Sequence, residues 1–513
     1  MTCVLLNHNF INEVQTITQL FFPGDGFRFV SEPLAEYPPG YVVQAEISES
    51  AAMAQVYKDS ILTSEYSLPL DSLPLHLSPG RVLMLALYHA LQAAIGAYAP
   101  WGALTGIRPS KMVREWLDAG WSDEKIVATL ADPFCCTHEK ARLALTVAHA
   151  ERDLTGRIFK QPSEAGLCNT KSGLQPPYNP IGIYISIPFC PSRCVYCSFN
   201  VNHNFASKDI HAQYIAAVVQ ECKTQADRLR QMGGTISSIY IGGGTPTVLS
   251  ESLLEQLLDS VAEVFLPTEE FSVEAGRPDT LTKDKLDILR RYGVNRLAVN
   301  PQTLKDKTLS LIGRKHTAAD FFKAFNIARD MGFTCINTDI IAGLPGETPD
   351  DMRRTMEGIA ELSPENITVH TLAVKRASRL NEILSDSVAS LGKCSRGLPD
   401  GTVWFGAEPH LIEEMLAIAG NACADAGLNP YYMYRQKNMV GMFENVGYSK
   451  PGYECLYNVG MMAETQTVLG IGAGAVSKFV EEGKISREFN VKNPEIYVER
   501  QQVSNIHKNE TER

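Results

Sequence analysis

The residues best suited to chemistry are three cysteines in the stretch YISIPFCPSRCVYCSFN, namely Cys190, Cys194 and Cys197. Compact cysteine groups are usually metal sites, and thiolates favour zinc or iron–sulfur clusters. A structural zinc site takes four ligands, but the next candidate, His203, lies well beyond Cys197. A cubane cluster normally takes four thiolates, so three of them leave one iron open to a substrate or cofactor. The spacing therefore favours such a cluster over a structural metal or simply buried thiols.

Further polar groups follow the apolar segments downstream of the cysteines. The glycines of IYIGGGTPTVL let the backbone approach a ligand and expose carbonyls that can accept from an ammonium. Carboxylates can accept from ribose hydroxyls, and the arginine fork can pair with a carboxylate. Side chains of these kinds lie at or just beyond the ends of later segments: Glu274, Gln302, Arg314 and Asp339. Taken singly, each side chain could be a surface or barrel-layer group, and the glycines could form an ordinary turn. Because all of them lie at strand ends or in the loops that follow, a binding site is favoured.

Six apolar segments would position these groups. They are residues 181–187, 236–242, 270–276, 295–301, 334–343 and 366–374, separated by helical stretches of crossover length. Six such βα units imply a parallel sheet that curls into a partial or full barrel. The loops after the strands would then share one rim, where an active site forms. Thr317 with Asp320, and Thr348 with Pro349, predict the starts of two of the helices.

The rest of the chain divides on either side of this core, which spans residues 181–374. Residues 1–157 predict a small α/β module followed by helices, and residues 158–180 a Pro- and Gly-rich linker. Residues 375–513 predict a C-terminal domain that covers the substrate. It would hold a helix at 407–427, an aromatic and basic loop or hairpin at 429–452, and a glycine-rich strand and turn at 467–479.

Composition narrows the classes of function. The 513 residues include 47 Lys and Arg against 58 Asp and Glu, a net charge of −11 with no basic block, which disfavours nucleic-acid binding. The first residues lack the basic region of a signal peptide, and no window approaches 18 uninterrupted apolar residues. A cytoplasmic protein without a membrane span is therefore expected. The nine cysteines outside the cluster are scattered, as small buried hydrophobes would be.

The sequence resembles the radical S-adenosylmethionine (SAM) enzymes, whose cluster motif is CxxxCxxC. GGGTPT, VNPQTL…LIGRKHT, DIIAGLPGET and CLYN…GIGAGAVS make it similar to the oxygen-independent coproporphyrinogen III oxidase family. The long N-terminal extension and TVHTLAVKRAS look most like its coproporphyrinogen dehydrogenase HemZ-type branch. The resemblance implies an α/β fold: a partial (βα)6 radical SAM barrel with an N-terminal α/β plus helical extension and a C-terminal α+β domain.

The resemblance also implies a [4Fe-4S] cluster on the three cysteines, one or two SAM molecules and a 5′-deoxyadenosyl radical. Oxidases of the family convert two propionates of coproporphyrinogen III to vinyl groups in heme biosynthesis, with an electron donor such as a flavodoxin or ferredoxin. By motif position, the SAM contacts would be Tyr184, Tyr196, Gly243, Gly244, Thr245, Glu274, Gln302, Arg314 and Asp339. The carboxylates of a tetrapyrrole need cations at the barrel mouth, and the alternative to such a role is an ordinary solvated charge. The candidates are Lys375, Arg376, Arg379, Arg435 and Lys437.

Several positions depart from the pattern of the decarboxylating members. Ser186 stands where they often have histidine, and Ser198 and Phe199 follow the last cluster cysteine where they carry a further cysteine. The related heme-chaperone branch shares that phenylalanine but has HN where this chain has Tyr457 and Asn458. Three functions therefore stay open: oxidative decarboxylation, a heme-binding chaperone without it, or another radical reaction on a tetrapyrrole, such as methyl transfer or ring opening.

Overall fold

The structure is a computed structural model that describes residues 1–22, 25–71, 77–105, 108–159, 179–197, 208–374, 378–380, 396–397, 403–404, 409–435, 442–481 and 483–511. Its contacts divide the chain into two compact units. Unit 1 comprises residues 1–146, 435–437 and 441–443, and unit 2 comprises residues 147–434, 438–440 and 444–513. The boundary between the two units falls within helix α5 (His138–Ile158). Within the described ranges, no helix is long and apolar enough to cross a membrane.

Unit 1 is a five-stranded sheet with helices packed on it, which matches the predicted α/β module followed by helices. The sheet order is β2-β1-β3-β4-β5, with β1 parallel to β2 and β3 and the last three strands antiparallel. Helix α2 packs on α1 and on β4 and β5 and buries Leu83, Leu87 and Leu91. The elements are β1 Thr2–Leu6, α1 Ile11–Phe21, β2 Arg28–Val30, β3 Tyr41–Ile47, β4 Ala51–Lys58, β5 Ile61–Pro69, α2 Pro79–Ile95, α3 Pro109–Asp118, α4 Asp123–Ala131 and the start of α5.

Unit 2 is built on the six predicted strands, and all six are confirmed. They lie side by side and parallel in the order of the sequence. Their bounds are β6 Pro180–Ile187, β7 Thr235–Gly243, β8 Glu270–Glu274, β9 Arg296–Ala298, β10 Ile336–Ala342 and β11 Asn366–Thr371. Successive residues of a strand face opposite sides, so one face buries Ile183, Ile185, Ile239 and Ile241 while the other carries polar side chains.

The C-terminal segment extends this same sheet at both edges. Strand β16 (Thr467–Ile471) pairs parallel with β6 and is followed by antiparallel β17 (Val476–Glu481) and β18 (Lys484–Phe489). At the other edge β15 (Asn445–Ser449) pairs antiparallel with β11 and with β14 (Asn429–Tyr434), which is the predicted hairpin. The result is an 11-stranded sheet. The remaining elements here are β12 Arg396–Gly397, β13 Val403–Trp404, α13 Pro409–Asp425, α14 Leu456–Met462 and α15 Pro494–Thr511.

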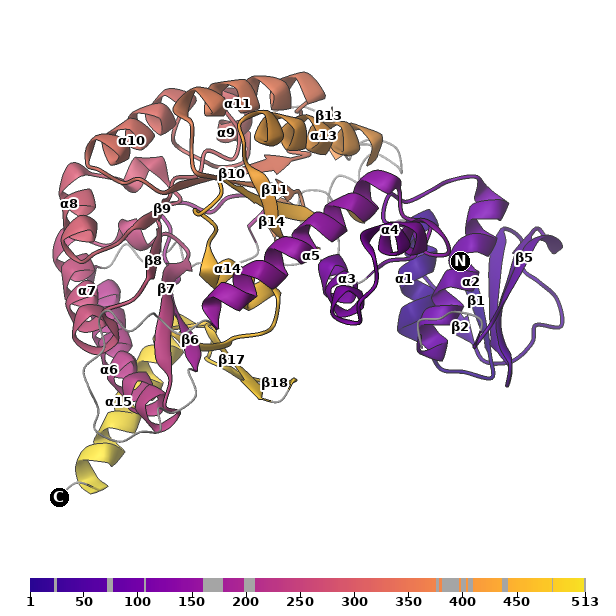
Figure 1. Cartoon of the computed structure of the whole chain (residues 1–513), viewed down its shortest axis with the longest axis horizontal. Helices are drawn as coiled ribbons and strands as arrows, with labels where there is room; N and C mark the ends of the chain where they lie inside the picture. Colours follow the sequence, from indigo (N-terminus) through magenta and orange to yellow (C-terminus); the bar gives the residue numbers. More distant parts are fainter. Residues whose placement is uncertain are drawn as a thin grey trace. The chain divides into compact units, whose positions relative to one another are not determined.

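Helices cover the apolar outer face of the sheet. Figure 1 shows them as an arc, and neighbours in that arc touch: α15 with α6, α6 with α7, α7 with α8, α8 with α10, α10 with α11, and α11 with α13. The predicted caps form, since both Thr317 and Thr348 accept from the third residue of their helix in a capping box. The bounds are α6 Lys208–Gln231, α7 Glu251–Phe265, α8 Lys283–Arg291, α9 Asp306–Leu311, α10 Ala318–Asp330 and α11 Pro349–Leu362, with 3-10 turns Pro246–Val248 and Pro278–Thr280.

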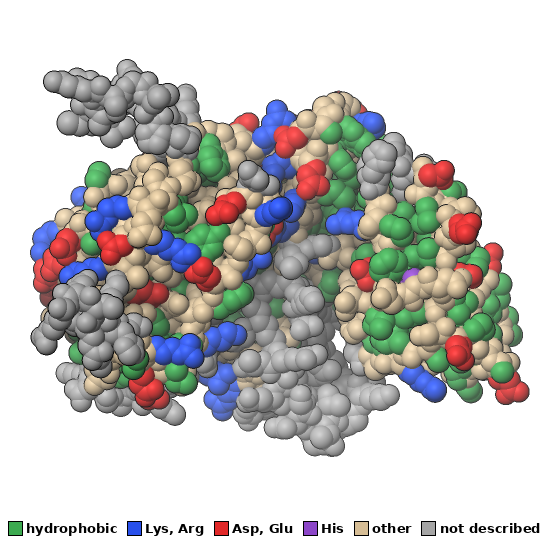
Figure 2. Space-filling model, turned by 90° about the horizontal axis from the view of Figure 1, so that it is seen from below, with side chains coloured by type: hydrophobic (Ala, Val, Ile, Leu, Met, Phe, Trp, Pro, Cys, Tyr) green, Lys and Arg blue, Asp and Glu red, His purple; other side chains and the backbone are tan. Residues whose placement is uncertain are grey.

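The surface charges fit this division into covered and solvated faces. In the view of Figure 2, Lys and Arg side chains are interspersed with Asp and Glu side chains over the described surface. Mixed charges of this kind are typical of a solvated surface.

Candidate cofactor site

The three clustered cysteines lie in the loop that follows β6, at the carboxyl end of the parallel strands. Backbone hydrogen bonds tie this loop to two other segments. The Val195 N–H donates to the Ile312 carbonyl at 3.0 Å, and the Leu380 N–H donates to the Val195 carbonyl at 2.7 Å. The Val195 side chain is buried in an apolar cluster with Leu309, Ile312, Ile341, Leu344, Leu372 and Leu380. The loop is therefore held from both sides by packed structure.

Hydrogen-bond donors approach two of the cysteine sulfurs. The Cys190 Sγ lies 3.3 Å from the Thr245 hydroxyl oxygen, and an Arg277 N–H donates to the Cys194 Sγ at 3.7 Å. Burial raises the pKa of the Cys190 thiol to about 11; nearby Cys197 and Cys194 add to the increase and the Thr245 hydroxyl opposes it. In the described ranges no three His, Cys, Asp or Glu side chains converge as on a metal ion. The cysteine loop therefore holds the thiols near hydrogen-bond donors, but their side chains do not converge on a single metal-ion position.

The glycine segment at the end of β7 runs along the cysteine loop. The Gly244 N–H donates to the Ile187 carbonyl at 2.8 Å, and the Thr245 N–H donates to the Phe189 carbonyl at 2.7 Å. A Cβ on Gly244 would come within 2.5 Å of the Phe189 carbonyl oxygen, so only glycine allows this close approach. The predicted role of GGGTPT in backbone approach thus has a direct structural reason.

Glu274 ends β8 beside these glycines. Its carboxylate accepts from the Tyr240 hydroxyl at 2.7 Å and from the Gly243 N–H at 3.2 Å. Burial raises the pKa of this carboxyl to about 7, and the Asp339 charge adds to the increase, whereas the hydrogen bond from Tyr240 opposes it. Tyr184 shares this inner face, with its ring centroid 6.3 Å from that of Tyr240. A partly buried carboxyl among tyrosines suits a cationic or hydroxyl-bearing ligand.

Asp339 is held on β10 by amides and an imidazole. Its two carboxylate oxygens accept from the Asn337 side chain at 2.7 Å and the Asn300 side chain at 2.8 Å, and the His370 Nε2 lies 3.7 Å away. Burial alone would raise the pKa of Asp339, but the nearby His370 imidazole and the hydrogen bond from Asn337 stabilise the charge and hold the pKa below its ordinary value. Gln302 adjoins it through the backbone, because its N–H donates to the Asp339 carbonyl at 3.0 Å.

Arg314 directly follows Gly313, whose carbonyl accepts from the Ser192 hydroxyl of the cysteine loop at 2.9 Å. It is 8% exposed and donates to the carbonyls of Gly276 at 3.1 Å and Asn300 at 2.6 Å. Its Nε has no hydrogen-bond partner among the described residues. The neighbouring His316 is buried, and this burial, reinforced by the charge of Arg314, lowers the pKa of the imidazole to about 4. The positive charge at this place therefore comes from guanidinium groups.

Comparison with known proteins identifies the family. The sequence matches the radical SAM superfamily over residues 184–359. It is 34% identical over 416 residues to the oxygen-independent coproporphyrinogen-III oxidase-like protein HemZ of Bacillus subtilis, covering 80% of this chain and 76% of that protein. The chain belongs to the oxygen-independent coproporphyrinogen III oxidase family of radical SAM proteins. This confirms the predicted family and its HemZ-type branch, and the six-stranded core is its radical SAM barrel.

Other relatives are named for two different functions, a heme chaperone and a coproporphyrinogen III oxidase. The heme chaperone HemW of Bacillus subtilis is 40% identical over 195 residues, covering 37% of this chain and 50% of that protein. The oxygen-independent coproporphyrinogen III oxidase of Escherichia coli is 33% identical over 201 residues, covering 38% and 43% respectively. Membership of the superfamily implies a [4Fe-4S] cluster and SAM. The cysteine loop, with three thiols and donors to two of them, has the chemistry to hold such a cluster.

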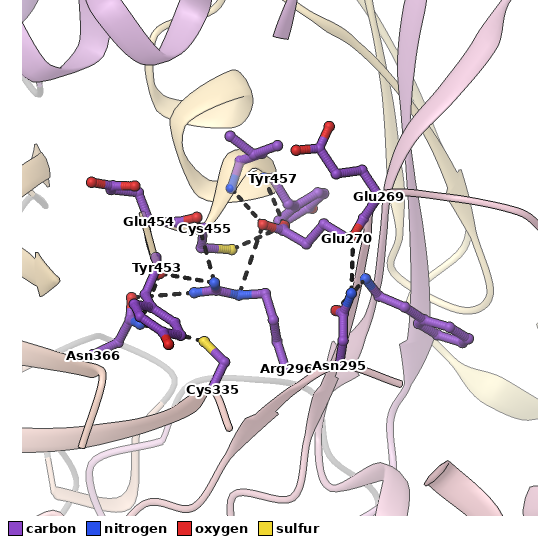
Figure 3. Close-up of polar contacts among 12 residues, drawn as sticks. Glu269, Glu270, Asn295, Arg296, Cys335, Asn366, Tyr453, Glu454, Cys455 and Tyr457 are labelled. Carbon is purple, nitrogen blue, oxygen red and sulfur yellow. Dashed lines mark hydrogen bonds and ion pairs between the residues drawn. The ribbon is translucent and has the colours of Figure 1, made fainter. Parts of the chain in front are cut away.

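The base of the radical SAM barrel, opposite this rim, is closed by the chain around α14 (Figure 3). The Glu270 carboxylate accepts from the N–H groups of Leu456 at 2.7 Å and Tyr457 at 3.0 Å. Arg296 donates to the Tyr453 carbonyl at 2.8 Å. The ring of Tyr457 stacks 4.6 Å from that of Tyr240, which bonds Glu274. Closure of the base therefore supports the side chains at the rim.

The predicted tetrapyrrole contacts have varied positions. Arg379 is exposed and adjoins Leu380, which packs on the cysteine loop. Arg435 belongs to unit 1, where its buried guanidinium donates to the Leu104 carbonyl and, at 2.6 Å, to the Met442 carbonyl. Three positions lie outside the described residues: Lys375, Arg376 and Lys437.

Sequence reasoning did not single out several residues that the fold brings to the site. Arg277 contacts Cys194, and Asn300 and His370 contact Asp339. Asn300 and His370 follow the strand alternation that points Asp339 inward, so that pattern could have found them. Arg277 lies in the loop after β8, and only the tertiary structure places it against a cysteine.

Proposed function

We propose that this protein generates a 5′-deoxyadenosyl radical from SAM and uses it for the oxygen-independent oxidative decarboxylation of coproporphyrinogen III. The supporting observation is the cysteine loop at the carboxyl rim, with the glycine segment and Glu274 beside it. The names of the HemZ-type and Escherichia coli relatives support the substrate. At each of two propionates the substrate loses carbon dioxide, one hydrogen atom, which the 5′-deoxyadenosyl radical takes up, and one electron, which passes to a one-electron acceptor; a vinyl group remains.

In this proposal Cys190, Cys194 and Cys197 hold the [4Fe-4S] cluster. When bound, the cluster and SAM supply the radical, and a flavodoxin or ferredoxin supplies the electron. The SAM contacts come from the glycine segment and from tyrosine, glutamine, carboxylate and guanidinium side chains around it: Tyr184, Tyr196, Gly243, Gly244, Thr245, Glu274, Gln302, Arg314 and Asp339. One or two SAM molecules would bind there.

The residues around these contacts orient them. Tyr240 and the Gly243 N–H fix the Glu274 carboxylate so that it can accept from an ammonium or a hydroxyl. Asn300 and Asn337 hold both oxygens of Asp339, which makes that carboxylate a rigid acceptor rather than a free one. Arg379 is exposed and precedes Leu380, which packs on the cysteine loop, so we propose it as a cation that meets a substrate carboxylate, with Lys375 and Arg376 as further candidates. Arg435 is not proposed for this role, because its buried guanidinium donates to the Leu104 and Met442 carbonyls.

A second function, a heme chaperone without decarboxylase activity, is favoured by two observations. The Bacillus subtilis HemW is 40% identical over the part that aligns. Ser186 is buried on β6 beside Gly243, where decarboxylating relatives often carry a histidine.

An anaerobic assay separates the two functions. The protein, reconstituted with iron and sulfide, is given reductant, SAM and coproporphyrinogen III. Decarboxylation predicts 5′-deoxyadenosine and a product lacking two carboxyl groups. Stoichiometric heme binding without substrate-dependent 5′-deoxyadenosine would overturn it in favour of the chaperone. Cys194→Ala should abolish the brown cluster absorption, whereas Cys222→Ala, a buried thiol on helix α6, should retain it.

A further inference from the structure

Arg277 stands out because its guanidinium is fully engaged at the cysteine loop. It is 3% exposed, and it lies in the segment between β8 and the Pro278–Thr280 turn. It makes five hydrogen bonds, which equals the number of its N–H donors. No other common side chain could satisfy this arrangement, since lysine has three donors on one atom.

Three of these bonds go to the cysteine loop itself. Arg277 donates to the Cys194 Sγ at 3.7 Å, to the Ser192 carbonyl at 3.4 Å and to the Ser192 hydroxyl oxygen at 3.0 Å. The Ser192 hydroxyl in turn donates to the Gly313 carbonyl at 2.9 Å. The loop is thus fixed by a cation that touches one of its sulfurs.

The other two bonds aim the guanidinium. Asp279 accepts from the Arg277 Nε at 3.2 Å and from a terminal N–H at 3.4 Å, a bidentate pair. Asp279 is 24% exposed and Arg277 only 3%, so solvent screens the carboxylate more than the buried guanidinium. The positive charge therefore acts on Cys194 with only part of its effect cancelled by Asp279.

We propose that Arg277 is a positioning residue that fixes Cys194 and raises the reduction potential of the cluster bound there. Adding one electron from a chemical reductant such as dithionite makes a thiolate-bound cluster more negative. A donated N–H bond and a nearby cation stabilise that reduced form, and both are known determinants of cluster potentials. The inference rests on the cluster of the proposed function but not on its substrate, so it holds equally for a decarboxylase or a chaperone.

The test is a redox titration of the reconstituted full-length protein, without SAM or substrate, followed by electron paramagnetic resonance. Arg277→Gln should lower the ratio of reduced to oxidised cluster at a fixed potential about tenfold, which for one electron is about 59 mV. Asp279→Asn removes the opposing charge and should shift the potential the other way. Arg277→Lys should stay closer to the natural protein in potential while losing iron faster. Arg291→Gln, in an exposed ion pair on α8, is the control and should change neither quantity.

The signs of these shifts decide the outcome. If the Arg277→Gln and Asp279→Asn clusters load and titrate like the natural protein, Arg277 does not tune the cluster and the inference fails. If Arg277→Gln loses the cluster altogether, Asp279→Asn still carries the test, because an unchanged potential in that variant would also overturn it. Failure of the decarboxylation assay leaves these measurements unaffected, so the two proposals fail separately.

Discussion

Replacement of Glu270 by alanine tests how the base of the barrel is closed. The buried Glu270 carboxylate accepts two backbone N–H bonds from the start of α14, at 2.7 and 3.0 Å, and the Cys455 thiol donates to it at 3.3 Å. It also lies 3.8 Å from the Arg296 Nε. Figure 3 shows these contacts converging on the one carboxylate.

The expected loss follows from these contacts. A hydrogen bond to a charged group contributes about 1.5–3 kcal/mol, and removing one partner of a buried ion pair costs about 3–5 kcal/mol. Arg296 keeps its bonds to the Tyr453 carbonyl and to Asn366, so the lower end of the range applies. We expect the free energy of local opening around α14 to fall by about 3 kcal/mol. At about 1.4 kcal/mol per factor of ten, the local opening of residues 453–462 becomes roughly a hundredfold more frequent.

Amide hydrogen exchange followed by mass spectrometry measures this opening directly. Peptides from residues 453–462 should exchange much faster in Glu270→Ala, while peptides from β3 and β4 in unit 1 should not change. Glu269→Gln is the matched control, because Glu269 precedes Glu270 and has an exposed side chain. Exchange in Glu270→Ala that equals the control would refute the idea that this carboxylate anchors α14.

Three further predictions concern the rim and the helices. Burial raises the pKa of Glu274 from 4.5 to about 7, so the native state binds this proton more tightly than the unfolded state does. The free energy of unfolding should therefore fall by up to about 3 kcal/mol as pH rises between these two values. Glu274→Gln should flatten this part of the pH profile in denaturant titrations, and an unchanged slope in that variant would contradict the prediction. Gly313→Ala should reduce cluster loading and lower the free energy of unfolding by about 1–3 kcal/mol. The φ of Gly313 is +79°, and a Cβ at this residue would lie 2.9 Å from the Arg193 carbonyl oxygen of the cysteine loop. Gly293→Ala has a similar φ of +80° but no atom within 4 Å, so it should keep the cluster, and equal iron contents in the two variants would argue against a role for this contact. Thr348→Ala should cost about 1 kcal/mol in thermal or denaturant unfolding through loss of the α11 cap, and a Thr348→Ser variant should recover most of it.

The sequence by itself determined the local features of this protein. The six strands of the barrel are read from short segments in which apolar residues recur, because successive residues of a strand face opposite sides and one side of this sheet is buried. The starts of α10 and α11 follow from Thr317 and Thr348, since a cap depends on residues only three positions apart. The grouping of Cys190, Cys194 and Cys197 in one loop is likewise a property of their spacing.

Only the tertiary structure decided contacts between segments far apart in the chain. β16 joins the sheet beside β6, although its sequence predicts just a glycine-rich strand. Glu270 meets the start of α14, and Arg277 meets Cys194, across separations that no periodic pattern records. Such contacts depend on which faces of the helices and strands pack together. The burial of apolar side chains determines how whole elements are arranged, and this arrangement decides which polar residues meet.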